Sequence, residues 1–135
     1  MTAEQYLDRV KKIDLMIHNK QTELDRWESK ANSLGGSNFG ERVQSSRDLH
    51  KGQNAIDNCI DLDREIEALK QERKAIIETI EQLPSTEYDV IYKLYVQEYS
   101  MKEIAYHHGK SYDWMKQQKK NGLVRLQSMI DERRG

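Results

Sequence analysis

The sequence predicts an all-α protein in which two long helices precede a C-terminal group of shorter helices. Three observations predict it. Glycine and proline, the strongest helix breakers, are absent from residues 1–34 and 53–83. Apolar residues in both stretches recur at alternating spacings of four and three. That pattern changes after Pro84, the only proline of the chain.

The composition supports this class. Of the 135 residues, 36% are hydrophobic and 33% are charged, and the net charge is −1. Few apolar residues and balanced charges suit long helices that bury a narrow stripe. No apolar run is long enough for a membrane span or a signal peptide, so we expect a cytoplasmic protein without a membrane partner. The lone Cys59 excludes an intrachain disulfide and leaves no cysteine cluster for zinc.

The two long stretches carry matching apolar stripes. The first consists of Tyr6, Val10, Ile13, Ile17, Leu24, Trp27, Ala31 and Leu34. The second consists of Ala55, Cys59, Leu62, Ile66, Leu69, Ile76, Ile80 and Leu83. A spacing of four and three averages about 3.5 residues, the period of a left-handed coiled coil. The stripes therefore predict a helical hairpin within one chain or a coiled coil between chains, the second giving a homodimer, and the sequence leaves both open.

Each stripe has one charged interruption, Lys20 in the first and Arg73 in the second. Polar residues at such positions can fix the register or the oligomeric state. The interpretation we favour is that their long aliphatic stems extend along the stripe and carry the charge to solvent.

Residues 35–52 are predicted to connect the two helices. Four of the seven glycines lie there, and residues 35–40 read as a flexible turn. Residues 41–50 could form a short helix bearing Val43 and Leu49. We expect residues 35–52 to form a surface loop. We assign residues 1–83 as a whole to oligomerisation or partner contact.

Residues 84–135 form the second predicted domain. A short amphipathic helix is expected over 86–97. Ser100 and Glu103 then have the spacing of a capping box, in which each side chain bonds the other's backbone N–H. Gly109 ends the next helix, and Ser111 opens a longer final one. Two helices around a glycine-containing turn predict a helix-turn-helix.

The final helix carries the charge that this motif needs. Residues 110–125 hold five basic side chains and one acidic one, a local charge of +4. The basic residues are Lys110, Lys116, Lys119, Lys120 and Arg125. Such side chains neutralise DNA phosphates, and Tyr112, Gln117, Gln118 and Asn121 can hydrogen-bond base edges. The pattern therefore predicts double-stranded DNA as the partner.

Residues 83–126 resemble the region 4 helix-turn-helix of bacterial sigma factors. The resemblance rests on Val90-Ile91-Tyr92-Lys93-Leu94-Tyr95, Ser100-Met101-Lys102-Glu103-Ile104-Ala105, Gly109, Ser111, Leu123 and Leu126. The whole chain is similar to the phage-encoded sigma-like family of Gram-positive prophages, akin to the ArpU-type late transcription regulators. This resemblance implies regulation of phage or prophage genes with host RNA polymerase as a further partner.

The resemblance also implies roles for individual residues. The recognition helix, residues 111–130, would lie in the major groove with Tyr112, Asp113, Lys116 and Gln117 at the bases. Ser111 would cap this helix beside a phosphate. The chain departs from the family pattern at His108, at Gln118 and at Gly122, which lowers helix propensity by about 1 kcal/mol relative to alanine. We therefore expect the last helix to be weakened or kinked at Gly122.

Other classes of function are weaker matches. A small terminase subunit of a phage also couples a helix-turn-helix to long helices, and a module that binds polymerase without DNA would share the same fold. Neither His107 nor His108 has a cysteine or carboxylate at ligand spacing, so no metal site is predicted and a surface or partly buried pair is expected. No phosphate-binding glycine loop or nucleophile–base pattern is present, so we expect neither an enzyme nor a cofactor.

Overall fold

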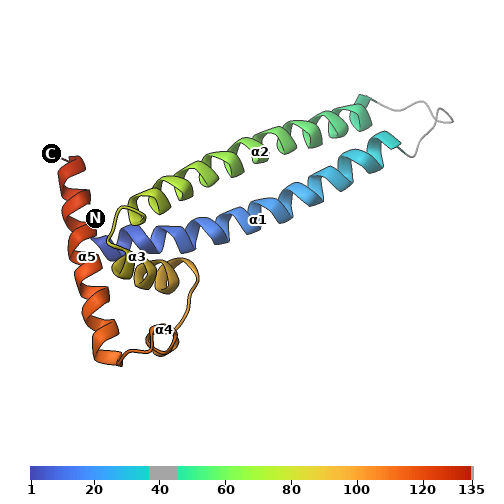
Figure 1. Cartoon of the computed structure of the whole chain (residues 1–135). Coiled ribbons are helices and arrows are strands. Elements are labelled where there is room, and N and C mark those ends of the chain that lie inside the picture. The colour runs from blue at the N-terminus through green and yellow to red at the C-terminus, as the bar shows by residue number, and fades with distance from the viewer. Residues whose placement is uncertain (37–45, 135) are drawn as a thin grey trace. The chain divides into compact units, whose positions relative to one another are not determined.

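The computed structural model describes the backbone of residues 1–36 and 46–134, and the side chains of residues 1–32 and 54–133. The described chain is all-helical, which confirms the predicted class. Figure 1 shows the elements in chain order. They are α1 (Ala3–Gly36), α2 (Ser46–Ile80), α3 (Ser85–Ile91), the π-helix η1 (Tyr92–Val96), α4 (Met101–His108) and α5 (Tyr112–Arg134).

Both long helices reach further into the predicted connector than expected. Helix α1 continues to Gly36, and α2 begins at Ser46 rather than at residue 53. Gly52 therefore lies inside a helix, because one glycine costs a long helix only about 1 kcal/mol relative to alanine. The expected boundary at 52 is wrong for this reason. Of the short helix expected over 41–50, the last five residues belong to α2 and the others lie outside the described residues.

The described residues form two compact units. One comprises residues 1–14 and 72–135, and the other comprises residues 15–71. Each unit therefore contains part of both α1 and α2. The boundary between the units does not follow Pro84, because the start of α1 and the end of α2 pack with α3 to α5 in the first unit.

In the unit of residues 15–71, the predicted stripes supply the buried side chains. Leu24 lies buried on α1, and Ala55, Ile66 and Leu69 lie buried on α2. The Lys20 ammonium donates to Glu65 Oε2 over 2.8 Å, which joins the two helices through the interruption in the first stripe.

In the other unit, the stripes again face inward. Val10 and Ile13 of α1 and Ile76 and Ile80 of α2 are buried. The stripe pattern missed Ala3 and Leu7, which are buried as well.

Polar contacts join the two helices in this unit. The Tyr6 hydroxyl donates to Thr79 Oγ1 over 3.1 Å, and Arg73 Nε donates to Asp14 Oδ1 over 2.7 Å. Because the later α1 residue meets the earlier α2 residue, the helices run in opposite directions here. The charged interruption Arg73 thus binds a carboxylate on the facing helix, as Lys20 does, so each charge is paired as well as partly exposed.

The helix expected over 86–97 is present, but its second half is not α-helical. After Ile91 the backbone widens to a π-helix, in which Gln97 N–H donates to Tyr92 O over 3.1 Å. All five residues of η1 are half-buried. Such a turn, with hydrogen bonds between residues five apart, occurs mostly as a single insertion in an α-helix, and apolar spacing does not reveal it.

Candidate nucleic-acid interface

Helix α4 is fixed at both ends by the residues that the sequence indicates. Ser100 Oγ accepts a hydrogen bond from Glu103 N–H over 3.2 Å, which confirms one half of the capping box. The other half, from Ser100 N–H to the Glu103 carboxylate, is not among the bonds of the described residues. At the other end Gly109 is left-handed (φ 63°), and Lys110 N–H donates to Ala105 O over 3.0 Å. This is the Schellman arrangement that most often requires glycine.

Helix α5 begins three residues after this glycine. Ser111 Oγ accepts from Trp114 N–H over 3.1 Å, so Ser111 caps the helix as predicted. Two capped helices are thus separated by a turn of three residues, Gly109 to Ser111.

A buried cluster holds α3, α4 and α5 together. Its buried members are Val90, Ile104, Ala105 and Met115. Trp114 packs against this cluster while remaining half-buried. Because Met115 points into the cluster, the opposite side of the first turns of α5 faces away from it.

Five of the predicted DNA-binding residues lie within the first three turns of α5, with Asp113, Gln117 and Lys120 on that outward side. They are Tyr112, Asp113, Lys116, Gln117 and Lys120, and all are exposed. The capping Ser111 is exposed beside them. The Lys116 ammonium lies 5.4 Å from the centre of the Tyr112 ring, and Gln117 Nε2 donates to Asn121 Oδ1 over 3.0 Å. The structure thus brings these side chains together on consecutive turns.

The remaining two predicted residues, Lys119 and Arg125, lie elsewhere on α5. Lys119 is half-buried and faces the start of α1. Arg125 Nε lies 2.8 Å from Oε2 of Glu87, a buried carboxylate on α3. The Arg125 N–H does not point at this oxygen, so the contact is an ion pair without a hydrogen bond.

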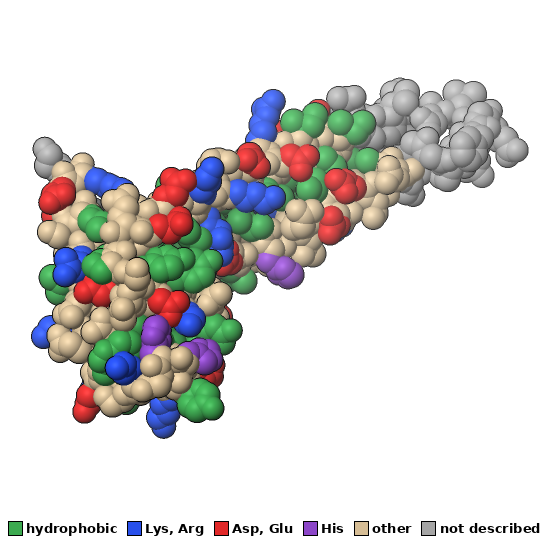
Figure 2. All heavy atoms as spheres, in the orientation of Figure 1, with side chains coloured by type: hydrophobic (Ala, Val, Ile, Leu, Met, Phe, Trp, Pro, Cys, Tyr) green, Lys and Arg blue, Asp and Glu red, His purple; other side chains and the backbone are tan. Residues whose placement is uncertain are grey.

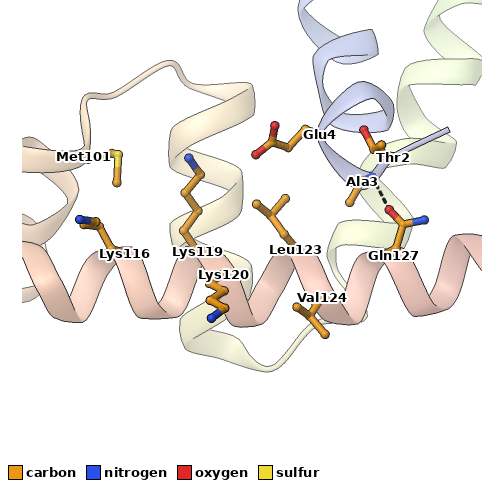
Figure 3. Close-up of a pocket in the computed structure, with 10 residues that line it drawn as sticks. All are labelled: Thr2, Ala3, Glu4, Met101, Lys116, Lys119, Lys120, Leu123, Val124 and Gln127. Atoms are coloured by element: carbon orange, nitrogen blue, oxygen red, sulfur yellow. Dashed lines mark hydrogen bonds between the residues drawn. The ribbon is translucent and has the colours of Figure 1, made fainter.

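A hollow of about 590 Å³ borders the outward side of α5. Three lysines of α5 line it together with apolar residues, and the start of α1 supplies one wall. The lining residues are Thr2, Ala3, Glu4, Met101, Lys116, Lys119, Lys120, Leu123, Val124 and Gln127. Figure 3 shows the Glu4 carboxylate across the hollow from Lys119.

Gln127 attaches the start of α1 to α5. Its Oε1 accepts from Ala3 N–H over 2.7 Å, the dashed line in Figure 3. Its Nε2 donates to Asp131 Oδ1 over 3.0 Å. Sequence reasoning missed this wall, because Ala3 and Gln127 are 124 residues apart and neither belongs to a recognisable motif.

Carboxylates also lie close to this region of α5. Burial and the nearby Glu4 and Asp8 raise the pKa of Tyr95 to about 12. In Figure 2, blue and red side chains are interspersed on the visible face rather than separated into single-sign areas. The basic character of α5 is therefore local.

Two of the three departures from the family pattern have structural explanations. Helix α5 runs without interruption through Gly122, so the weakening or kink expected there does not end the helix. His108 is half-buried and its Nε2 lies 2.6 Å from Asp89 Oδ2, while Asp89 also pairs with Lys93 at 3.0 Å. Asp89 comes from α3, so the spacing within the His107-His108 segment could not reveal it.

Among the described residues, no three histidine, cysteine or acidic side chains gather where they could hold a metal ion. In the same residues, none of the helices combines the length and apolar character that a membrane span requires. Comparison with models of protein families, with curated proteins and with solved structures found no match to this chain.

Proposed function

We propose that the chain is a sequence-specific double-stranded DNA-binding regulator of transcription. In this proposal α4, the Gly109 turn and α5 form the helix-turn-helix, and the first turns of α5 enter the major groove. The long helices form an antiparallel hairpin within the chain, which the Tyr6–Thr79 and Asp14–Arg73 contacts support. The family resemblance adds phage or prophage genes as targets and host RNA polymerase as a partner, and the proposal places the chain in the cytoplasm.

One observation carries the proposal. Tyr112, Asp113, Lys116, Gln117 and Lys120 form an exposed row on the first turns of α5, while Met115 in the same turns is fully buried. A reading helix needs this division, since its inner side must be held rigidly while its outer side reaches base edges and phosphates. In this proposal Gln117 bonds a base, and Lys116 and Lys120 bond phosphates.

The proposed set of DNA-contacting residues is smaller than the set that the sequence alone predicts. Arg125 is paired with the buried Glu87, and moving it to a phosphate would leave that carboxylate without its cation. Lys119 faces α1 rather than the outward row. The proposed interface therefore consists of Ser111, Tyr112, Asp113, Lys116, Gln117 and Lys120.

Selection of bound duplexes from a random pool tests the proposal. Successive rounds should enrich one motif with the wild-type chain. Gln117→Ala should relax the preference at one position of that motif, because a lost base contact costs about 1–3 kcal/mol at that base pair.

A matched control is Gln71→Ala in α2. Gln71 is exposed and its Nε2 donates to Glu67 Oε1, one helical turn away, as Gln117 does to Asn121 on α5. This variant loses an equivalent side chain outside the proposed interface and should select the wild-type motif. Failure to enrich any motif, together with no retention of DNA at low salt, would support the alternative of a module that binds protein alone.

A further inference from the structure

The hollow beside α5 has a floor and a rim of different chemistry. Met101, Leu123 and Val124 supply apolar surface, and Val124 is 62% exposed. Lys116, Lys119 and Lys120 place three positive charges around this surface, against the single carboxylate of Glu4. A complementary partner would present a short apolar ridge flanked by carboxylates.

The outer face of α2 has this character. Ile56 and Ile60 lie one helical turn apart and are 49% and 45% exposed, which is unusual for isoleucine. Asp63 and Glu67 continue the same line toward the C-terminus, and both are exposed. Spacings of four, three and four place these four residues on one side of the helix. This side is exposed and lies about 100° around the helix from the buried stripe.

We propose that the outer α2 face of one copy of this chain docks in the lysine-rimmed hollow of a second copy. Ile56 and Ile60 cover the apolar floor, and Asp63 and Glu67 pair with the lysines. Two different surfaces meet, so the contact is heterologous and differs from a symmetric pairing of the heptad stripes. Because the occupant uses Lys116 and Lys120, self-association competes with DNA for the same charges.

The surfaces match in charge as well as in size. Along α2 the line from Ile56 to Glu67 spans about 17 Å at 1.5 Å per residue. Along α5 the lining residues run from Lys116 to Gln127, the same number of residues apart. Carboxylates facing lysines predict an association that weakens as salt increases, because exposed ion pairs are screened.

Charge reversal tests the proposal with the full-length chain. By sedimentation velocity at low salt, the wild type should sediment faster as its concentration rises. Lys120→Glu and Asp63→Lys should each remove this concentration dependence. A one-to-one mixture of the two variants should restore it, since the unaltered hollow of Asp63→Lys then meets the unaltered α2 face of Lys120→Glu.

Lys102→Glu is the control, because Lys102 is an exposed lysine of α4 that does not line the hollow, and it should associate like the wild type. All the substituted side chains are exposed, and circular dichroism checks that each variant remains helical. A wild type that stays monomeric at every concentration would overturn the proposal. So would single variants that associate normally, or a mixture that stays monomeric. None of these results depends on DNA, so the proposed function can fail or hold separately.

Discussion

Gly122 lies against Ile91, where α5 crosses α3. A Cβ atom at position 122 would stand 2.8 Å from Ile91 Cγ1 and 3.2 Å from Ile91 Cδ1. Both residues are buried, and Ile91 is fully covered. The absent side chain therefore allows the close approach of the two helices that position the outward row of α5.

Gly122→Ala should lower the free energy of unfolding despite the better helix propensity of alanine. Overpacking costs about 1–3 kcal/mol and alanine returns about 1 kcal/mol, which leaves a net loss of roughly 1 kcal/mol. Denaturant unfolding measures this loss. Ile91→Ala removes both crowded atoms, so the double variant should show a favourable coupling of at least about 0.5 kcal/mol.

Gly109→Ala is the matched control for this cycle. Gly109 has a positive φ of 63°, and a Cβ atom added there would meet nothing within 4 Å, so its substitution strains the backbone without a clash. The expected loss is about 1–2 kcal/mol. Gly109→Ala should not couple to Ile91→Ala, and equal coupling for both glycines would contradict the role given to Gly122.

Glu98 offers a second backbone test. It has a φ of 60° after η1, where Tyr99 N–H donates to Lys93 O over 2.9 Å. Glycine adopts this conformation without steric cost, so Glu98→Gly should stabilise the protein by about 1 kcal/mol. Its carboxylate lies 3.8 Å from Lys11 in an exposed pair, and Glu98→Ala should show that losing this pair changes stability by less than about 1 kcal/mol. A melting temperature of Glu98→Ala equal to or above that of Glu98→Gly would contradict the backbone strain assigned to Glu98.

The Arg9–Glu72 pair should make the free energy of unfolding depend on pH in the acidic range. Arg9 Nη2 donates to Glu72 Oε1 over 3.0 Å, and this bonding lowers the pKa of Glu72 below its ordinary value of 4.5. As the pH falls, the unfolded chain binds the proton first. The contribution of the Arg9–Glu72 pair to the free energy of unfolding is therefore present above pH 4.5. It is lost as the pH falls through the folded-state pKa of Glu72. This contribution should be small, because the side chains of Arg9 and Glu72 are 33% and 42% exposed.

Urea unfolding as a function of pH measures this contribution. Glu72→Gln should be less stable than the wild type near neutral pH and should lose less stability on acidification. Glu78→Gln, at an exposed glutamate of the same helix, should retain the wild-type acid dependence. Parallel curves for Glu72→Gln and the wild type would rule out the pair as a source of this dependence.

Local sequence signals predicted much of the fold. The heptad spacing identified the buried sides of α1 and α2, because such a spacing places side chains on one face of any helix. Ser100, Gly109 and Ser111 marked helix ends correctly, since each acts through its own backbone or the next turn. These features depend on neighbours within a few residues.

Features that depend on residues far apart in the sequence were not predicted. Gly122 looked like a defect because Ile91, which explains it, lies on another helix. Nothing in the sequence around Arg125 indicated its pairing with Glu87. Nothing at the start of α1 indicated its bond to Gln127. Such contacts arise only when the helices pack, so spacing along one helix does not contain them.

A salt titration of DNA binding tests the central claim most directly. Using the duplex selected by the wild-type chain, fluorescence anisotropy gives the affinity at several salt concentrations for Lys116→Ala and for Lys74→Ala, an exposed lysine of α2. Loss of one phosphate contact should reduce the slope of log affinity against log salt by about 1 for Lys116→Ala, while Lys74→Ala keeps the wild-type slope. Identical slopes and affinities for both variants and the wild type would contradict the claim that the first turns of α5 bind DNA.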